Sequence, residues 1–208
     1  MDMQFYGANC ISLTTKQVRL IIDDNLEDLG AKSVTREGDV VLFTGIHSTP
    51  RKPAKISIDK PGEYEVQGVF IYGIVARGHL EESGKKTSTM YKIMSDDLNV
   101  LITGHIYPEL SDSQLEAIGM VDVMVVPVGG NGYTLDSTGA LTLIKKVEPK
   151  LVVPTYYNDG ELKFPVPPAS LEDALKNLPM ETKESVQKLR IKSADLSDVT
   201  QLIIVERS

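Results

Sequence analysis

Each of the three histidines in this chain directly follows a short apolar run, which is where a metal-binding loop could begin. They are His47, His79 and His105, and the runs that precede them are 39–46, 74–78 and 100–104. Imidazole is a common zinc ligand, and β-sandwiches build metal sites from loops at strand ends. A lone histidine is more often a hydrogen-bonded structural residue, so both interpretations stay open. Three histidines at equivalent positions nevertheless favour a common site.

The elements that would position these histidines are short strands in the first half of the chain. Runs of β-branched and apolar residues, separated by turn signals, predict strands at Met3–Tyr6, Cys10–Thr14, Val18–Ile22, Val40–Thr44, Lys55–Ile58, Val69–Ala76, Met90–Met94 and Val100–Thr103. Pro61–Tyr64 and Glu82–Lys85 have the composition of turns between antiparallel strands. A further short turn is expected at Asp24–Leu29.

The second half of the chain alternates between helix and strand signals. The predicted helices are Ser111–Ile118, Ala140–Val147 and Leu171–Leu178, and the predicted strands are Val121–Val128, Leu151–Pro154 and Thr200–Val205. Ser111 and Ser170 are suited to cap helix N-termini, and Gly119 is suited to follow a helix end. The order strand, helix, strand between residues 121 and 154 predicts a βαβ unit.

Composition limits the classes of partner and the compartment. The 208 residues include 22 Lys and Arg against 29 Asp and Glu, and the resulting net charge of −7 argues against binding to a nucleic-acid backbone. The single cysteine, Cys10, cannot form an internal disulfide or a cysteine-rich zinc site. Neither a signal peptide nor an apolar stretch of the roughly 18 residues that a membrane helix needs is evident. We therefore expect a cytoplasmic domain with a small-molecule substrate and no membrane or nucleic-acid partner.

Six segments resemble the metallo-β-lactamase superfamily, in its branch of short bacterial, lactonase-like metal-dependent hydrolases. The resemblance spans roughly residues 4–158 and is carried by segments 5–10, 20–23, 40–44, 101–105, 122–135 and 149–157. It implies an α+β fold, the αββα sandwich, in which two mixed β-sheets pack face to face with helices on the outer faces. A single domain over residues 1–208 is expected, with residues 165–208 as a C-terminal closing segment.

The family's metal-binding motif is degenerate in this chain. The family pattern T-H-x-H-x-D-H corresponds to Thr44-Gly45-Ile46-His47-Ser48-Thr49-Pro50, which keeps one histidine. The resemblance places His105 where the family has a bridging aspartate and Tyr156 where it has its final histidine. A two-metal site of the family type therefore cannot be assembled, because Thr, Pro and a neutral Tyr are poor replacements for Asp and His ligands.

What remains implies at most one zinc ion, held by His47, His79 and His105, with an open fourth position of the kind catalytic zinc uses. Asp23 is a candidate to support a ligand, and Tyr133 and Tyr156 are candidates to contact substrate. The implied function is a zinc-dependent hydrolase of an ester, lactone or phosphodiester. The alternative is a non-catalytic binding or scaffold protein that kept the fold and lost the metals, with the histidines bonded to backbone or solvent.

Overall fold

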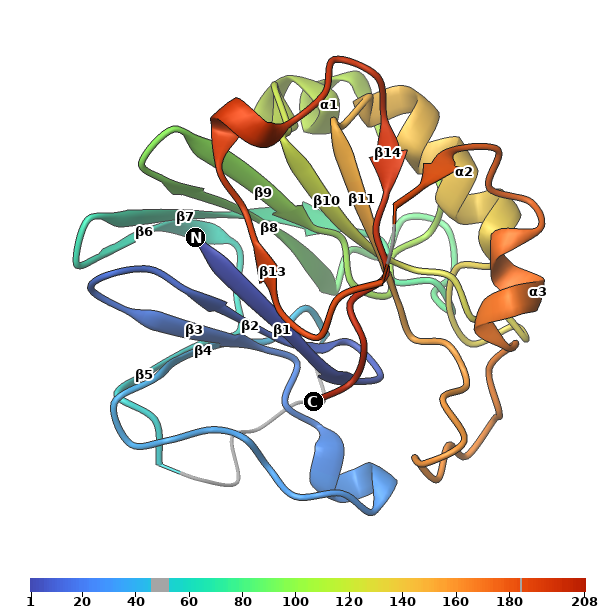
Figure 1. Ribbon diagram of the computed structural model, residues 1–208, viewed down its shortest axis with the longest axis horizontal. Coiled ribbons are helices and arrows are strands. Elements are labelled where there is room, and N and C mark those ends of the chain that lie inside the picture. The colour runs from blue at the N-terminus through green and yellow to red at the C-terminus, as the bar shows by residue number, and fades with distance from the viewer. Residues whose placement is uncertain (46–52, 184) are drawn as a thin grey trace.

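The computed structural model, which describes residues 1–45, 53–183 and 185–208, contains two mixed β-sheets packed face to face (Figure 1). In the described residues, the first sheet has six strands in the order β13-β1-β2-β3-β4-β5 and the second has eight in the order β12-β14-β11-β10-β9-β8-β7-β6. The six strands are β1 (Asp2–Gly7), β2 (Cys10–Thr14), β3 (Arg19–Ile22), β4 (Val40–Leu42), β5 (Ile56–Ile58) and β13 (Leu189–Arg190). The eight strands are β6 (Gly62–Val66), β7 (Val69–Ala76), β8 (Ser88–Ser95), β9 (Leu98–Ile102), β10 (Val123–Pro127), β11 (Leu151–Thr155), β12 (Glu181–Thr182) and β14 (Gln201–Leu202). The expected sandwich of two mixed sheets is confirmed.

The main core lies between the two sheets. Strand β1 alternates between partly exposed and buried residues, so that Met3 and Phe5 point into the core. The β8 residue Tyr91 is fully buried, and its hydroxyl donates to the Phe43 and Ile58 carbonyl oxygens at 3.0 and 3.3 Å. Since Phe43 and Ile58 belong to the other layer, this phenol ties the two sheets together.

The α-helices lie along the outer side of the eight-stranded sheet (Figure 1). They are α1 (Asp112–Ile118), α2 (Ser137–Val147) and α3 (Leu171–Leu175). Strands β10 and β11 are buried along their whole length, as parallel strands covered on both faces must be. The predicted βαβ unit is confirmed, because β10 and β11 pair in parallel across α2. No helix in the described part of the chain has the length and hydropathy that a bilayer crossing requires.

Loops cover the outer face of the six-stranded sheet. The 3₁₀ helix η1 (Leu26–Leu29) and the loop residue Leu162 pack on apolar side chains that β2, β3, β4 and the residue after β4 turn away from the main core. Those side chains are Cys10, Ile21, Val41 and Phe43. The buried cysteine is therefore a filler of this second, smaller core.

Two helix starts follow from their capping residues. Ser111 forms a capping box with Gln114 at the start of α1, as the sequence predicts for this serine. Helix α2 begins at Ser137, three residues before the predicted Ala140, because the side chain of Asp136 accepts a hydrogen bond from the Gly139 amide at 2.7 Å and acts as the N-cap. The other prediction, that Ser170 caps α3, is confirmed, although α3 ends at Leu175.

The prediction of a turn at Pro61–Tyr64 is wrong. Strand β6 occupies most of this segment and pairs antiparallel with β7. The turn lies instead at Gln67 and Gly68, whose φ angles of 52° and 78° are those that two-residue hairpins use. The Pro-Gly pair was the more conspicuous turn signal, but it stands at the beginning of the strand.

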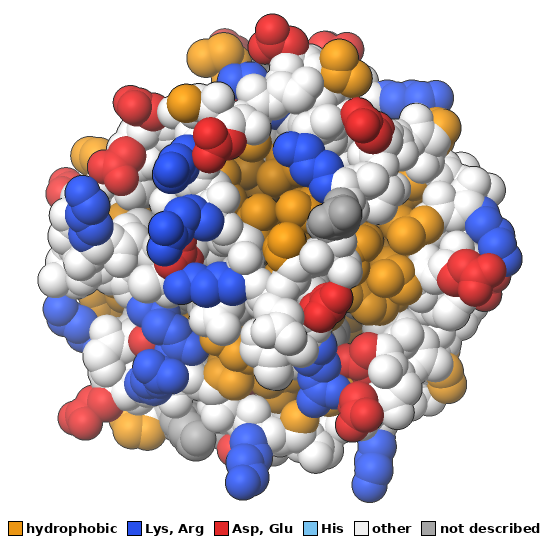
Figure 2. All heavy atoms as spheres, viewed as in Figure 1, with side chains coloured by type: hydrophobic (Ala, Val, Ile, Leu, Met, Phe, Trp, Pro, Cys, Tyr) orange, Lys and Arg blue, Asp and Glu red, His pale blue; other side chains and the backbone are white. Residues whose placement is uncertain are grey.

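The C-terminal residues contribute strands to both sheets. Strands β12 and β14 extend the eight-stranded sheet, while β13 pairs with β1 at the edge of the six-stranded sheet. The N-terminal amino group donates to the Ile191 carbonyl at 3.1 Å, and the Ser208 amide donates to the Phe5 carbonyl at 2.9 Å. On the face shown in Figure 2, Lys and Arg side chains gather on the side where Figure 1 shows the N-terminus and β13. Lys188 and Arg190 form ion pairs with Asp2.

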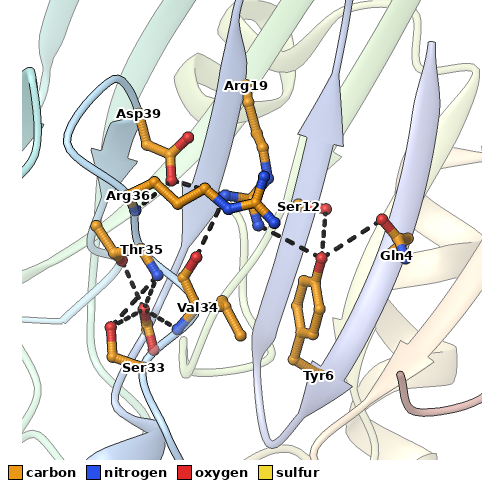
Figure 3. A network of polar contacts seen from close by, with 10 residues as sticks. Gln4, Tyr6, Ser12, Arg19, Ser33, Val34, Thr35, Arg36 and Asp39 are labelled. Atoms are coloured by element: carbon orange, nitrogen blue, oxygen red, sulfur yellow. Dashed lines mark hydrogen bonds and ion pairs between the residues drawn. The ribbon is translucent and has the colours of Figure 1, made fainter.

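The loop between β3 and β4 is held down by a network of polar contacts (Figure 3). Arg19 donates to the Asp39 carboxylate at 2.7 Å, and the Arg36 amide donates to the same oxygen at 2.7 Å. Within the loop, one carboxylate oxygen of Asp24 accepts hydrogen bonds from the amides of Val34 and Thr35 at 3.0 and 2.9 Å. These contacts fix the chain immediately after Asp23.

Candidate active site

A cavity of about 420 Å³ opens where the ends of strands from both sheets meet. Most of its lining residues follow the carboxyl ends of strands, namely β1, β3, β4, β7, β9, β10 and β11. The residues most relevant to chemistry are Asp23, Thr44, His79, His105, Tyr133 and Tyr156. We call this space the site cavity.

Asp23 is a buried carboxyl group held by a neighbouring threonine. Its two oxygens accept hydrogen bonds from the Thr44 amide at 2.8 Å and from the Thr44 hydroxyl at 2.6 Å. Burial nevertheless raises the pKa of Asp23 from 3.8 to about 6, although both bonds from Thr44 act in the opposite direction. Asp23 also has a left-handed backbone, with φ of 48°, which aspartate tolerates better than most residues.

Gly104 makes this clamp possible. The residue has φ of 63°, and a Cβ atom built on it would overlap the Thr44 hydroxyl and Cβ. Only glycine therefore lets the chain turn after β9 while Thr44 stays in reach of Asp23.

His79 and His105 are brought together by a backbone contact. The His79 amide donates to the His105 carbonyl at 2.8 Å. Burial lowers the pKa of both imidazoles, that of His105 to about 4 with a smaller contribution from His79, so both rings are neutral at pH 7. In the described structure, the Nδ1 atom of each ring is buried without a hydrogen-bond partner.

Two tyrosines form an aromatic wall beside His105. Tyr133 and Tyr156 stack with ring centroids 5.7 Å apart, and the His105 ring stands edge-on to Tyr156 at 4.5 Å. Tyr156 has a left-handed backbone, with φ of 54°, while its amide donates to the Ala8 carbonyl at 2.7 Å across the two sheets. Such a conformation is costly for a bulky residue. Burial, and then the neighbouring Tyr133, raise the pKa of the Tyr156 phenol, which stays neutral.

The polar lining of the site cavity is acidic. Asp23, Asp28 and Glu81 contribute carboxyl groups, and among the lining residues that the structure describes there is no lysine or arginine. Glu81 accepts hydrogen bonds from the amides of Gly78 and Thr87 at 2.8 and 3.3 Å, so it closes the loop that carries His79. At the mouth, Leu80 and Tyr133 remain 67% and 40% exposed and supply apolar surface.

The described residues offer few donor atoms for a metal ion. Within residues 1–45, 53–183 and 185–208, no three His, Cys, Asp or Glu side chains are grouped so that they could hold a metal. His79 and His105 offer two neutral imidazoles, the protonation state that binds metals, and His47 lies outside the described residues. Tyr156 offers a neutral phenol, which is a poor metal ligand.

Five of the six site residues named from the sequence line the same cavity, and the sixth, His47, lies outside the described residues. Thr44 and Glu81 also line it, and the sequence did not reveal their roles. Thr44 bonds to Asp23, which lies 21 residues away, so only the fold identifies that contact. Glu81 bonds to the amides of Gly78 and Thr87 within its own loop, but no motif marks it.

Comparison with known proteins gives a consistent result. The profile of the family described as "Beta-lactamase superfamily domain" matches residues 2–156. A UPF0173 metal-dependent hydrolase of Thermoplasma acidophilum is 25% identical over 189 residues, covering 76% of this chain and 84% of that protein. A second UPF0173 metal-dependent hydrolase, from Salinibacter ruber, is 26% identical over 195 residues, covering 76% and 85%.

A solved structure extends the similarity to nearly the whole chain. A protein of the metallo-beta-lactamase superfamily from Thermotoga maritima superposes with a TM-score of 0.74 at 22% identity, covering 99% of this chain and 98% of that one. At this level of identity the comparison shows the fold, including the C-terminal strands that the family profile does not reach.

Proposed function

This chain belongs to the beta-lactamase superfamily, and from that premise we propose that it is a metal-dependent hydrolase whose reaction takes place in the site cavity. The two curated relatives carry the same broad activity in their names. The observation that carries the proposal is that His79, His105 and Asp23 line one cavity at the strand ends. A single zinc ion is the proposed cofactor, with His47, His79 and His105 as its ligands.

The proposed substrate is an uncharged ester or lactone with an apolar substituent. Carboxyl groups without a lysine or arginine, among the described lining residues, would repel the negative charge of a phosphodiester. Leu80 and the stacked rings of Tyr133 and Tyr156 offer apolar contact at the mouth. The volume of about 420 Å³ suits a small molecule.

The residues of this chain have separable roles in that reaction. A zinc ion held by His47, His79 and His105 would lower the pKa of a bound water to near 7 and so make a nucleophile available. Asp23 is placed to accept and return a proton, because its pKa of about 6 keeps both protonation states accessible near neutral pH. Tyr133, whose side chain lines the cavity at its mouth and is 40% exposed, is the proposed contact for a substrate carbonyl, and Glu81 keeps the His79 loop closed.

Metal analysis together with a substrate panel tests the proposal. Zinc-supplemented protein should retain about one equivalent of zinc and hydrolyse p-nitrophenyl acetate or a δ-lactone faster than bis(p-nitrophenyl) phosphate. The variants His79→Ala and His105→Ala should lose both zinc and activity, while Met120→Ala, which alters a residue exposed on the surface, should keep both. Metal-free wild-type protein after supplementation, or hydrolysis that survives both histidine substitutions, would contradict the proposal.

The stacked tyrosines support a second candidate, a binding protein without catalysis. Tyr156 packs against Tyr133, His105 and Phe164, so aromatic rings fill space beside the imidazoles. On this hypothesis the cavity binds an apolar ligand, and zinc is not needed. Ligand binding that is equally tight with and without a chelator, in protein without hydrolytic activity, would favour this candidate.

A further inference from the structure

A second cavity, of about 470 Å³, lies on the other side of the loop that carries His79. It is formed by the loop residues Arg77, Lys85 and Lys86, by Tyr107, and by Lys146 near the end of α2. We call it the basic groove. It shares no described lining residue with the site cavity, although both use the segment 77–87 as a wall.

The guanidinium group of Arg77 is fixed in orientation. Its central carbon lies 3.8 Å from the centroid of the Tyr107 ring, and its Nε donates to the Glu81 carbonyl at 2.8 Å. The backbone closes the same unit, because the Tyr107 amide donates to the Arg77 carbonyl at 2.9 Å. Little conformational entropy remains to be lost when this side chain binds a ligand.

The terminal nitrogens of Arg77 have no acidic partner in the part of the chain that the structure describes. Three other arginines do: Arg19 pairs with Asp39, Arg190 with Asp2 and Arg207 with Asp159. An oriented guanidinium group whose terminal nitrogens are unpaired can bind an oxyanion through two parallel hydrogen bonds.

The groove is positive although the chain carries a net charge of −7. Four cationic side chains line it against one acidic lining residue, Glu109. Lys85 pairs with Glu82 at 3.4 Å, but both groups are largely exposed and the pair is weak. Neither Lys86 nor Lys146 forms an ion pair with any residue in the described ranges, which leaves both ammonium groups for a ligand.

We propose that the basic groove binds the phosphate group of a small phosphorylated molecule. A phosphate monoester can accept hydrogen bonds from the terminal nitrogens of Arg77 and from the surrounding ammonium groups. Its size suits the volume of the groove. A nucleic acid fits less well: the cations are gathered in one groove, and Arg77 already covers a face of Tyr107 on which a base would otherwise stack. The proposal does not depend on hydrolysis in the site cavity.

Calorimetric titration with glycerol 3-phosphate tests this assignment, with glycerol as the uncharged analogue. The wild-type protein should bind the phosphate ester and not glycerol. Arg77→Gln should weaken binding by on the order of tenfold or more. Arg77→Lys should recover only part of the lost affinity, since it restores the charge but not the two parallel N–H donors of a guanidinium group. Lys146→Gln should weaken binding, whereas Lys145→Gln, which alters the adjacent exposed lysine outside the groove lining, should not.

Three results would overturn the proposal. Equal losses of affinity in Lys145→Gln and Lys146→Gln would show that binding depends only on general surface charge, and would overturn the proposal. So would tighter binding of a single-stranded oligonucleotide than of the phosphate ester. If Arg77→Gln fails to fold, as judged by its circular dichroism, the double variant Lys86→Gln/Lys146→Gln provides the same test, and unchanged affinity in it would reject the groove.

Discussion

At the scale of single residues, the contact between Gly104 and the clamp that holds Asp23 leaves no room for a side chain. Gly104→Ala should place a methyl group against Thr44 at a backbone φ of 63°, so Thr44 must move and release the Asp23 carboxyl. We expect a loss of about 2–4 kcal/mol in the free energy of unfolding, measured in urea.

Gly132→Ala is the matched control for this substitution. Gly132 also has a left-handed backbone, with φ of 74°, but an added Cβ would meet no atom within 4 Å. Gly132→Ala should therefore lower the free energy of unfolding only by the cost of backbone strain, about 1 kcal/mol. Equal losses in the two variants would show that the clash with Thr44 is unimportant.

The two buried titratable groups of the site should make opposite contributions to stability as the pH falls. His105 has its pKa lowered from 6.5 to about 4, so between these values the unfolded chain binds more protons and acidification destabilises the fold. Asp23 has its pKa raised from 3.8 to about 6, so the folded chain binds more protons and acidification stabilises it. The two effects should largely offset each other in metal-free protein.

Urea unfolding of two variants between pH 4 and 6.5 separates these contributions. On acidification through this range, the free energy of unfolding of Asp23→Asn should fall by roughly 2–3 kcal/mol relative to that of wild type. That of His105→Gln should rise by a similar amount relative to wild type. Parallel pH profiles for both variants and wild type would mean that neither group titrates in this way.

The candidate site was predictable from the sequence only as far as individual residues carried a family pattern. His79, His105, Asp23, Tyr133 and Tyr156 were named on that basis, and they do line one cavity. Thr44 begins the family's metal-binding pattern, but that pattern does not indicate its hydrogen bond to Asp23, because the two residues lie 21 positions apart. Arg77 likewise gains its fixed orientation from Tyr107, which no spacing rule connects to it.

At the scale of elements, the Asp39 carboxylate fixes the end of the loop between β3 and β4. Asp39 accepts hydrogen bonds from Arg19 and from the Arg36 amide through the same oxygen, and it is almost completely buried. Asp39→Ala should lower the free energy of unfolding by about 2–3 kcal/mol, because it leaves both donors unsatisfied. In Asp39→Ala, amide hydrogen exchange should accelerate across residues 24–39 before it accelerates in the neighbouring strands.

Asp195→Ala, in the exposed 3₁₀ helix η2 (Ser193–Asp195), is the control for this change. It should alter stability by less than about 0.5 kcal/mol. If the two variants were equally stable, the polar network of Figure 3 would contribute little to holding the loop.

The elements themselves followed from the sequence wherever a local rule decided them. Strands β2 and β7 lie within the bounds predicted from their apolar residues, and α1 has its predicted cap. Strand β6 was missed because three of its five residues are Gly or Glu, which are poor strand formers, and its stability comes from pairing with β7. Tertiary pairing overrode local propensity there.

At the scale of the whole molecule, the predicted role of residues 165–208 as a closing segment of one domain can be tested by truncation. Ending the chain after Asp198 removes β14 together with the buried residues Leu202, Ile203 and Val205. The lost apolar burial, roughly 1.5–3 kcal/mol for each large side chain, should leave the protein aggregated or unfolded.

Ending the chain after Glu206 is the milder control. It removes the Arg207 ion pair with Asp159 and the Ser208 contact to Phe5, but keeps β14. This variant should fold with a slightly lower melting temperature. A soluble, cooperatively unfolding protein that ends at Asp198 would show that the last strand is dispensable.

The overall sandwich was predicted because its long buried strands carry the family pattern, whereas the closing strands carried none. Strands β12, β13 and β14 have two residues each, too few for any alternation of apolar and polar side chains to be recognised. The sequence predicted a last strand near the position of β14, but not that β13 crosses to the other sheet.

The pairing of β1 with β13 has a consequence for the order in which the protein can fold during synthesis. Strand β1 is synthesised long before β13, yet one of its edges is completed by residues 189–190, and Met1 bonds to Ile191. Contacts between segments so far apart in the sequence form late, because the intervening chain must first be ordered. The edge of β1 that pairs with β13 therefore stays open to other chains until residues 189–190 have been synthesised.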